Sequence, residues 1–236
     1  MVRLGSGGRR RTLSSEVVEM VFGHGHRNTA RGQMTRLIGI AGPSGSGKSE
    51  LSRRLSAVTG APVVSLDSYY RDLSHLTFEE RAKVNFDEPA SLDDGLLLTQ
   101  CAALSRGEAI DVPHYDFSSH TRVAGTQRLE PREMVIIEGL FTLYWNDLRA
   151  LLHTGVYVEL EDAACYARRL ARDVRERGRT PESVERQYCS TVRPMAEKYI
   201  WPTRRHAGVV VRGDAVLEES VAKVMAAGQL ASSVRI

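Results

Sequence analysis

One eight-residue segment constrains the fold of this chain more than any other feature. Residues 42–49 read Gly-Pro-Ser-Gly-Ser-Gly-Lys-Ser and match the pattern G-x-x-x-x-G-K-[ST] in full. An apolar run at 37–41 precedes the segment, and a helical pattern with Leu51 and Leu55 follows it. A glycine-rich loop between a strand and a helix points backbone N–H groups at phosphates, and the helix N-terminus adds partial positive charge. The sequence therefore predicts a nucleoside triphosphate site.

The residue types in this loop have separate chemical reasons. A Cβ at the glycines would intrude on the phosphates, Lys48 can reach the β- and γ-phosphates, and the Ser49 hydroxyl can ligate Mg²⁺. We expect ATP to contact Gly42, Ser44, Gly45, Ser46, Gly47, Lys48 and Ser49. The chain has neither the Asn-Lys-x-Asp of GTPases nor the Leu-Ser-Gly-Gly-Gln of transporter ATPases. A small-molecule kinase is the class that this pattern favours.

The remaining sequence alternates short apolar runs with longer amphipathic stretches, which is typical of a parallel sheet covered by helices. Strands are predicted at 37–41, 62–66, 134–137, 156–160 and 209–211, and helices at 50–59, 91–104, 163–176, 181–199 and 215–226. Alternating residues at 110–115 and 123–129, with Gly125, predict a small β-hairpin above the sheet. The expected fold class is α/β, a three-layer P-loop NTPase fold with an arginine-rich lid.

The first 33 residues differ in character from the rest. They are rich in glycine and arginine, so we expect a flexible extension over 1–33 and a kinase domain over 34–236, with Met34 as an alternative start. His24 and His26 have no nearby third ligand and predict a polar loop rather than a metal site.

Composition narrows the cellular setting and the partners. The net charge of +3 is mild and fits a phosphate pocket, so neither nucleic acid nor a membrane is expected as a partner. No apolar run approaches the ~20 residues of a membrane span. Three widely spaced cysteines argue for a reducing compartment, which predicts a cytoplasmic protein.

Two carboxylates follow predicted strands directly. Asp67 comes after the run at 62–66, and Glu138 comes after the run at 134–137. The carboxyl ends of parallel strands face the ligand crevice of such a sheet, so both side chains should lie near the loop. Asp67 could accept the proton of an attacking hydroxyl, and Glu138 could help to hold Mg²⁺.

Further motifs, met in a fixed order between about residues 37 and 213, resemble the uridine kinases, also called uridine–cytidine kinases. These motifs are Asp67-Ser68-Tyr69-Tyr70, Asn85-Phe86-Asp87-Glu88-Pro89, Tyr115-Asp116-Phe117 with His120-Thr121-Arg122, Ile137-Glu138-Gly139, the run Arg168–Arg179, and Gln187-Tyr188 with Thr191-Val192-Arg193-Pro194-Met195. The P-loop is shared by many ATPases, whereas this ordered set is highly specific.

The resemblance implies ATP-dependent phosphorylation of the 5′-hydroxyl of uridine or cytidine, with Mg²⁺, by a homotetramer in pyrimidine salvage. The implied catalytic residues are Asp67 as general base, Lys48, Arg169 and Arg172. The implied nucleoside-binding residues are Tyr70, Asp87 on the ribose hydroxyls, Tyr115, Phe117, His120, Arg169, Arg179 and Gln187. Arg177 would reach ATP, and Ser49 and Glu138 would hold the metal.

The arginines fit a lid on physical grounds. Arg169 and Arg172 are three residues apart and share a helix face. Arg177 and Arg179 flank Gly178, which is expected to end the helix. Closure of that segment would bring guanidinium charge onto the migrating phosphoryl group and exclude water.

Some positions depart from the family pattern, and two alternatives stay open. Glu88 stands where the family usually has His, and His114 precedes Tyr115 where an apolar residue is usual. One alternative is a sister kinase acting on pantothenate, phosphoribulose or another sugar-like alcohol, which Tyr115, His120 and Asp87 disfavour. The other is a non-catalytic nucleotide-binding protein, which Asp67 and Glu138 disfavour.

Overall fold

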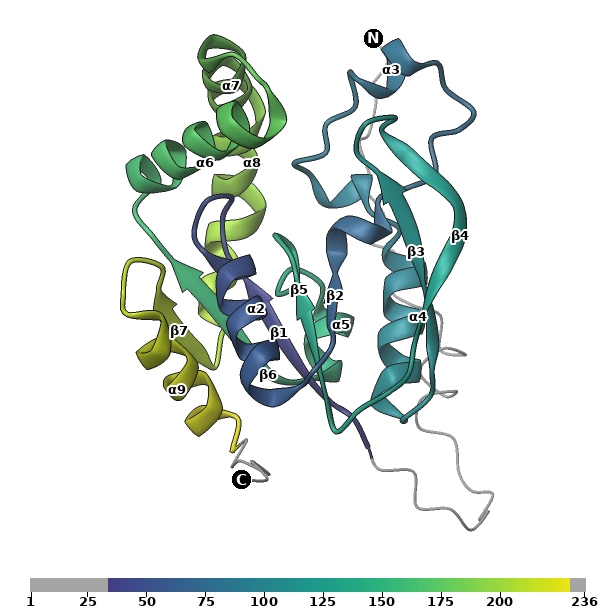
Figure 1. Cartoon of the computed structure of the whole chain (residues 1–236), viewed down its shortest axis with the longest axis vertical. Helices are drawn as coiled ribbons and strands as arrows, with labels where there is room; N and C mark the ends of the chain where they lie inside the picture. The colour runs from purple at the N-terminus through teal and green to yellow at the C-terminus, as the bar shows by residue number, and fades with distance from the viewer. Residues whose placement is uncertain (1–33, 230–236) are drawn as a thin grey trace, which may run out of the picture. The chain divides into compact units, whose positions relative to one another are not determined.

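A five-stranded parallel sheet forms the centre of the computed structural model, which describes residues 34–229. Its strands lie in the order β2-β5-β1-β6-β7 (Figure 1). They are β1 (Arg36–Ala41), β2 (Val63–Ser65), β5 (Met134–Glu138), β6 (Leu152–Glu159) and β7 (Val209–Arg212). The predictions for the N-terminal extension, including His24 and His26, lie outside the described residues.

Successive residues of the central strands alternate between two hydrophobic layers. Leu37, Val135 and Ile137 belong to one buried cluster, whereas Ile38 and Ile136 belong to the other. Neighbouring side chains of a strand point to opposite faces, so strands buried on both faces need continuous apolar runs. The sheet is therefore the middle layer of a three-layer α/β fold, and the predicted fold class is confirmed.

Helices cover each face of the sheet. On one face, α2 (Lys48–Thr59) and α9 (Leu217–Ala227) supply Leu51, Leu55 and Val224 to the core. On the other face, α4 (Asp94–Ser105) and α5 (Asn146–Leu151) supply residues such as Leu97 and Leu148. No helix among residues 34–229 is long and apolar enough to cross a bilayer.

The predicted hairpin is present as a two-stranded antiparallel sheet of β3 (Ile110–Asp116) and β4 (Thr121–Leu129). It lies beside α4 and the short elements that follow β2, namely η1 (Leu66–Tyr69), α3 (Phe78–Arg81) and η2 (Pro89–Ser91) (Figure 1). Two hydrogen bonds join the hairpin to the segment between η1 and α3. Thr121 Oγ1 accepts a hydrogen bond from the backbone N–H of Leu73 at 2.9 Å and donates one to Asp72 at 3.0 Å.

The predicted single helix at 181–199 is wrong in detail. After α6 (Asp162–Arg177), the chain forms α7 (Pro181–Gln187), a π-helical turn η3 (Tyr188–Val192), α8 (Arg193–Met195), a second π turn η4 (Ala196–Ile200) and a 3₁₀ turn η5 (Trp201–His206). The apolar positions keep a roughly helical spacing through these turns, so periodicity alone does not reveal them. The first π turn begins directly after Gln187, at the edge of the candidate site.

Candidate active site

The loop between β1 and α2 has the conformation that its glycines predict. Gly45 has φ +86° and Gly47 has φ +101°, in the left-handed region that favours glycine. A Cβ on Gly45 would also lie 2.3 Å from the carbonyl oxygen of Cys165. Helix α2 begins at Lys48, so the positive end of its dipole faces the loop. The loop is thus shaped for an anion.

Lys48, Ser49 and Glu138 meet at the start of α2. The Ser49 hydroxyl donates to Glu138 Oε1 at 3.2 Å, and Lys48 Nζ lies 3.9 Å from the same oxygen. The register of the sheet places them together, since Glu138 pairs with Ile40 just before the loop. Burial raises the pKa of the Glu138 carboxyl, the charge of Lys48 acts in the opposite direction, and Asp67 raises the pKa further.

The donor set of Ser49 and Glu138 suits a hard cation. Mg²⁺ prefers oxygen ligands, and in phosphotransferases it takes one or two protein oxygens while phosphates and water complete its shell. Among residues 34–229 no group of three or more His, Cys, Asp and Glu side chains forms a full metal cage. The residues fit a magnesium ion that binds together with a triphosphate.

Asp67 lies in η1, immediately after β2, as the sequence predicts. Its side chain is half-buried, and burial raises the pKa of its carboxyl, while the charges of Lys48, Arg177 and Arg172 act in the opposite direction. A carboxylate with a raised pKa is a stronger proton acceptor than an exposed aspartate. The fold therefore brings Asp67 within electrostatic reach of Lys48, Arg172 and Arg177.

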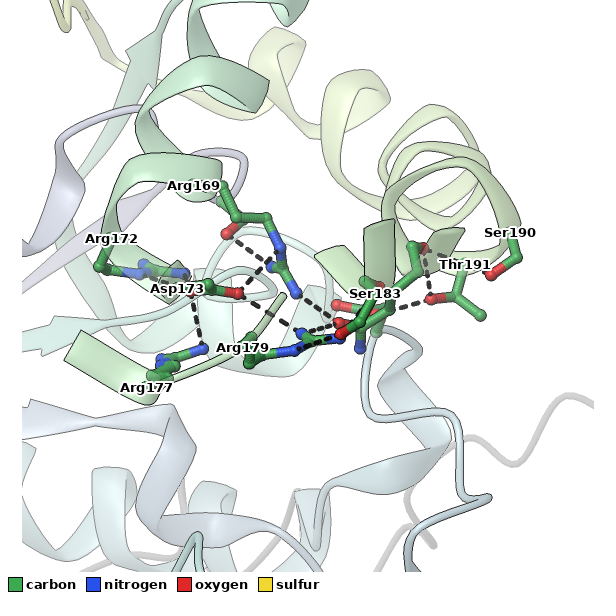
Figure 2. A network of polar contacts seen from close by, with 11 residues as sticks. Arg169, Arg172, Asp173, Arg177, Arg179, Ser183, Ser190 and Thr191 are labelled. Carbon is green, nitrogen blue, oxygen red and sulfur yellow. Dashed lines mark hydrogen bonds and ion pairs between the residues drawn. The ribbon is translucent and has the colours of Figure 1, made fainter. Parts of the chain in front are cut away.

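Four predicted arginines converge on one buried carboxylate, Asp173, which is 0% exposed. Figure 2 shows them around it. Their shortest ion-pair distances to Asp173 are 3.6 Å for Arg169, 2.9 Å for Arg172, 3.3 Å for Arg177 and 3.6 Å for Arg179. Helix α6 ends at Arg177, and Gly178 turns the chain with φ +62° so that Arg179 returns to the same carboxylate. Sequence analysis missed this role of Asp173, although the residue lies inside the arginine motif.

Arg169 links this network to the loop and to the following helix. Its Nη1 donates to Ser44 Oγ at 2.9 Å, and its Nη2 donates to Gln187 Oε1 at 3.1 Å. Burial lowers the pKa of the guanidinium, and the carboxylates of Asp87 and Asp173 act in the opposite direction. Since the pKa of arginine starts near 12.5, the group stays charged at neutral pH. Arg169 is thereby fixed between the P-loop and the predicted substrate residues.

An aromatic cluster lies close to Asp67, on the elements of the hairpin side. The ring of Tyr115 lies 5.1 Å from Tyr70 and 5.2 Å from Phe117, and His120 stacks on Phe86 at 5.8 Å. Phe117 is 56% exposed, and His120 adopts a left-handed φ of +52° at the turn. Sequence analysis missed Phe86, which stands next to Asp87 in its motif. The cluster brings the predicted Tyr70, Tyr115, Phe117 and His120 together.

The hydroxyl groups of the cluster differ in their partners. Tyr70 donates to the carbonyl oxygen of Phe86 at 3.3 Å, whereas the Tyr115 hydroxyl is buried without a hydrogen-bond partner among the described residues. Burial raises the pKa of Tyr115 to about 12, with Asp116 and Asp67 adding to the shift. A buried hydroxyl without a partner costs free energy, so it is a candidate contact for a ligand.

A cavity of about 270 Å³ lies between the end of the P-loop, α6 and the turn after β7. Its walls include Gly47, Leu51, Arg168, Arg212 and Gly213. Arg168 Nη1 donates to the carbonyl oxygen of Gly213 at 2.9 Å. A Cβ on Gly213 would lie 1.9 Å from the carbonyl oxygen of Ser46, so the loop after β7 packs directly on the P-loop. Gly47 was predicted as an ATP contact, whereas the sequence alone does not indicate Arg212 and Gly213 as site residues, because only the fold brings β7 to the loop.

Comparisons with known proteins find similar sequences and a similar fold. The Phosphoribulokinase / Uridine kinase family model matches residues 37–217. A uridine kinase of Staphylococcus epidermidis is 43% identical over 180 residues, which cover 75% of this chain and 87% of that protein. A uridine kinase of Deinococcus deserti is 44% identical over 178 residues, which cover 74% of this chain and 86% of that protein. The solved structure of D-glycerate 3-kinase from Cryptococcus neoformans has a TM-score of 0.54 at 18% identity, and the match covers 78% of this chain and 84% of that chain. This similarity shows a shared fold.

Proposed function

Because the chain belongs to the phosphoribulokinase and uridine kinase family, we propose that it transfers the γ-phosphoryl group of ATP to the 5′-hydroxyl of uridine or cytidine. In this reaction the 5′-oxygen forms a bond to the γ-phosphorus, and the bond from that phosphorus to the β,γ-bridging oxygen breaks. The products are the nucleoside monophosphate and ADP.

The electrostatic coupling of Asp67 to two sets of groups supports this proposal most directly. On one side its pKa responds to Lys48, Arg177 and Arg172, the groups suited to phosphates. On the other side, its charge contributes to the raised pKa values of Tyr70 and Tyr115, which burial causes in the main. A general base for phosphoryl transfer must lie at such a boundary, where the acceptor hydroxyl meets the γ-phosphate.

Each side then has its own task. The P-loop N–H groups and Lys48 hold the phosphates, and the lid arginines stabilise charge that develops on the migrating group. Mg²⁺, held by Ser49 and Glu138, would neutralise charge on the β- and γ-phosphates. Asp87, the aromatic cluster and Gln187 hold the nucleoside, and the cavity beside Gly213 takes the adenine of ATP, with Arg168 against its face.

The aromatic cluster separates this function from that of a sister kinase. A pyrimidine base offers a π-face for stacking, whereas a phosphosugar or pantothenate offers none and would leave the rings of Phe86 and Tyr115 unused. Phosphoribulose nevertheless stays the second candidate, since the family description includes phosphoribulokinase.

A coupled assay of ADP release tests the proposal. The full chain is incubated with ATP, Mg²⁺ and one acceptor at a time: uridine, cytidine, adenosine, ribulose 5-phosphate or pantothenate. We expect turnover with uridine and cytidine alone. Turnover confined to a phosphosugar or to pantothenate would overturn the nucleoside assignment, and no turnover with any acceptor would favour a nucleotide-binding protein. Light scattering of the same sample tests the proposed homotetramer.

A further inference from the structure

A hydrogen bond joins the ribose-binding candidate Asp87 to a residue that no role above includes. Thr191 Oγ1 donates to Asp87 Oδ2 at 3.1 Å across 104 positions of sequence. Figure 2 shows Thr191 beside Ser190, at one end of the polar network. Thr191 belongs to the π turn η3, and π turns are frequent at functional sites.

The Thr191 hydroxyl has one proton and two acceptors within reach. The second acceptor is the backbone carbonyl oxygen of Gln187, also at 3.1 Å. A hydrogen bond to an ionised carboxylate is stronger than one to a neutral carbonyl, so ionised Asp87 takes the proton. That bond uses Oδ2 and leaves Oδ1 for a ligand. Among residues 34–229, Thr191 provides the one side-chain hydrogen bond to this carboxylate.

The rest of the contacts around Asp87 fix its backbone and its charge but not its carboxylate plane. The backbone N–H of Asp87 donates to Asn85 Oδ1 at 3.0 Å. Burial raises the pKa of Asp87, and the charges of Arg169 and Arg179 act in the opposite direction without a hydrogen bond to the carboxylate. A carboxylate that must accept from vicinal hydroxyls needs a defined plane, since hydrogen-bond strength falls steeply with misalignment. Through its hydrogen bond to Oδ2, Thr191 is placed to hold the Asp87 carboxylate in one plane.

We propose that Thr191 is the positioning residue that orients the Asp87 carboxylate toward the ribose hydroxyls and thereby sets the preference for ribonucleosides over deoxyribonucleosides. This inference rests on the proposed nucleoside kinase function. It requires the Thr191 hydroxyl, so removal of that group while the side-chain volume is kept should weaken recognition of the ribose and leave the ATP site intact.

The test compares three variants of the full chain. T191V is nearly isosteric but lacks the hydroxyl, T191S keeps the hydroxyl, and S190A is the matched control, because Ser190 Oγ also reaches the Gln187 carbonyl, at 3.5 Å, without contacting Asp87. For each variant, kcat/KM is measured with uridine and with 2′-deoxyuridine, together with KM for ATP and the melting temperature.

We expect T191V to lower kcat/KM for uridine about tenfold, the effect of one hydrogen bond to a charged group. The value for 2′-deoxyuridine should change little, so the ratio between the two substrates should fall, while KM for ATP stays constant. T191S should restore the ratio, and S190A should match wild type. A double-mutant cycle with D87N should show that T191V has no further effect once Asp87 is uncharged.

The outcomes separate this inference from the function on which it rests. Wild-type turnover of uridine with an unchanged substrate ratio in T191V overturns the role of Thr191 alone. An equal loss for uridine and 2′-deoxyuridine, with a lower melting temperature, also overturns it, because it indicates a purely structural residue. A wild-type chain that phosphorylates no nucleoside overturns the proposed function itself. If T191V does not fold, T191A and T191S carry the same comparison.

Discussion

The two sides of the candidate site are built on opposite principles. On the phosphate side, four guanidinium groups already surround the fully buried Asp173, and Arg169 is bonded to the P-loop. On the nucleoside side, packed rings define the space, and a polar atom such as the Tyr115 hydroxyl has no partner among the described residues. Guanidinium charge is gathered on one side and aromatic surface on the other, while both sides contain buried polar atoms without a hydrogen-bond partner among the described residues, such as Ser46 Oγ and the Tyr115 hydroxyl.

The difference follows from the chemistry that each side has to perform. Catalysis gains most from dipoles and charges that are oriented before the reaction, because no reorganisation is then needed in the transition state. Recognition of a base gains from polar groups that are satisfied only by the correct ligand. We therefore expect changes on the phosphate side to affect kcat and protein stability, and changes on the nucleoside side to affect KM for the nucleoside.

Asp67 belongs to both sides, so its substitution should give the largest effect. D67N removes the proton acceptor but keeps the volume of the side chain, and we expect kcat to fall about 10²–10⁴-fold. The dissociation constant of uridine, measured by calorimetry, should change little. The neighbouring S68A is the matched control and should retain activity. Near-normal turnover by D67N would exclude Asp67 as the general base.

Asp173 tests mainly the phosphate side. D173N leaves four guanidinium groups around a neutral amide, so we expect the free energy of unfolding to fall by about 3 kcal/mol, as for a broken buried ion pair. Urea denaturation measures this loss, and kcat should fall by a larger factor than KM for uridine rises, because only Arg169 and Arg179 of the four arginines are also candidate nucleoside contacts. E176Q removes an exposed carboxylate on the same helix, paired with Arg175, and should have almost no effect on stability. A stable and fully active D173N would show that the arginines need no common partner.

Tyr115 tests the nucleoside side alone. Y115F removes a buried hydroxyl without a partner among the described residues, and we expect KM for uridine to rise about tenfold, the value of one lost hydrogen bond. KM for ATP should stay constant and the melting temperature should not fall, since the phenyl ring still packs on Tyr70. Y157F is the control, because Tyr157 is buried in the sheet instead. An unchanged KM in Y115F would remove this hydroxyl from base recognition.

The smallest effect concerns pH. Burial raises the pKa of Asp67 above its ordinary 3.8, so kcat should fall as pH decreases through a value above 3.8. A raised pKa in the folded state also means that the stability present at low pH is lost as pH rises through that pKa. D67N should therefore melt at a higher temperature than wild type at neutral pH, and the gap should shrink on acidification. A gap that widens instead would reverse the sign of the shift.

The sequence predicts the phosphate side well because its features are local. The loop 42–49 is contiguous, and Asp67 and Glu138 follow strands whose carboxyl ends must face the crevice in any parallel sheet. The same reasoning predicts the end of α6 at Gly178. Each of these conclusions needs only a strand, a helix or a turn, which short sequence patterns specify.

The features that the sequence does not predict depend on distant contacts. The spacing of Asp173 predicts ion pairs with arginines of its own helix. Its complete burial and its contact with Arg179, which lies beyond the end of the helix, are evident only in the structure. Thr191 meets Asp87 across the site, and no pattern within either segment indicates the other. The start of β6 at Leu152 was also missed, because His153 and Gly155 interrupt the apolar run and β-pairing with β1 overrides that local signal.

The close approach of Gly213 to Ser46 has a consequence for tolerance of change. The strand farthest from β2 ends against the loop at residues 42–49, so the conformation of this loop depends on the turn that follows β7. Even a single methyl group at position 213 must displace either this turn or the loop itself. Substitution at position 213 is therefore restricted by the packing of this turn on the loop, although the two segments are more than 160 positions apart in the sequence.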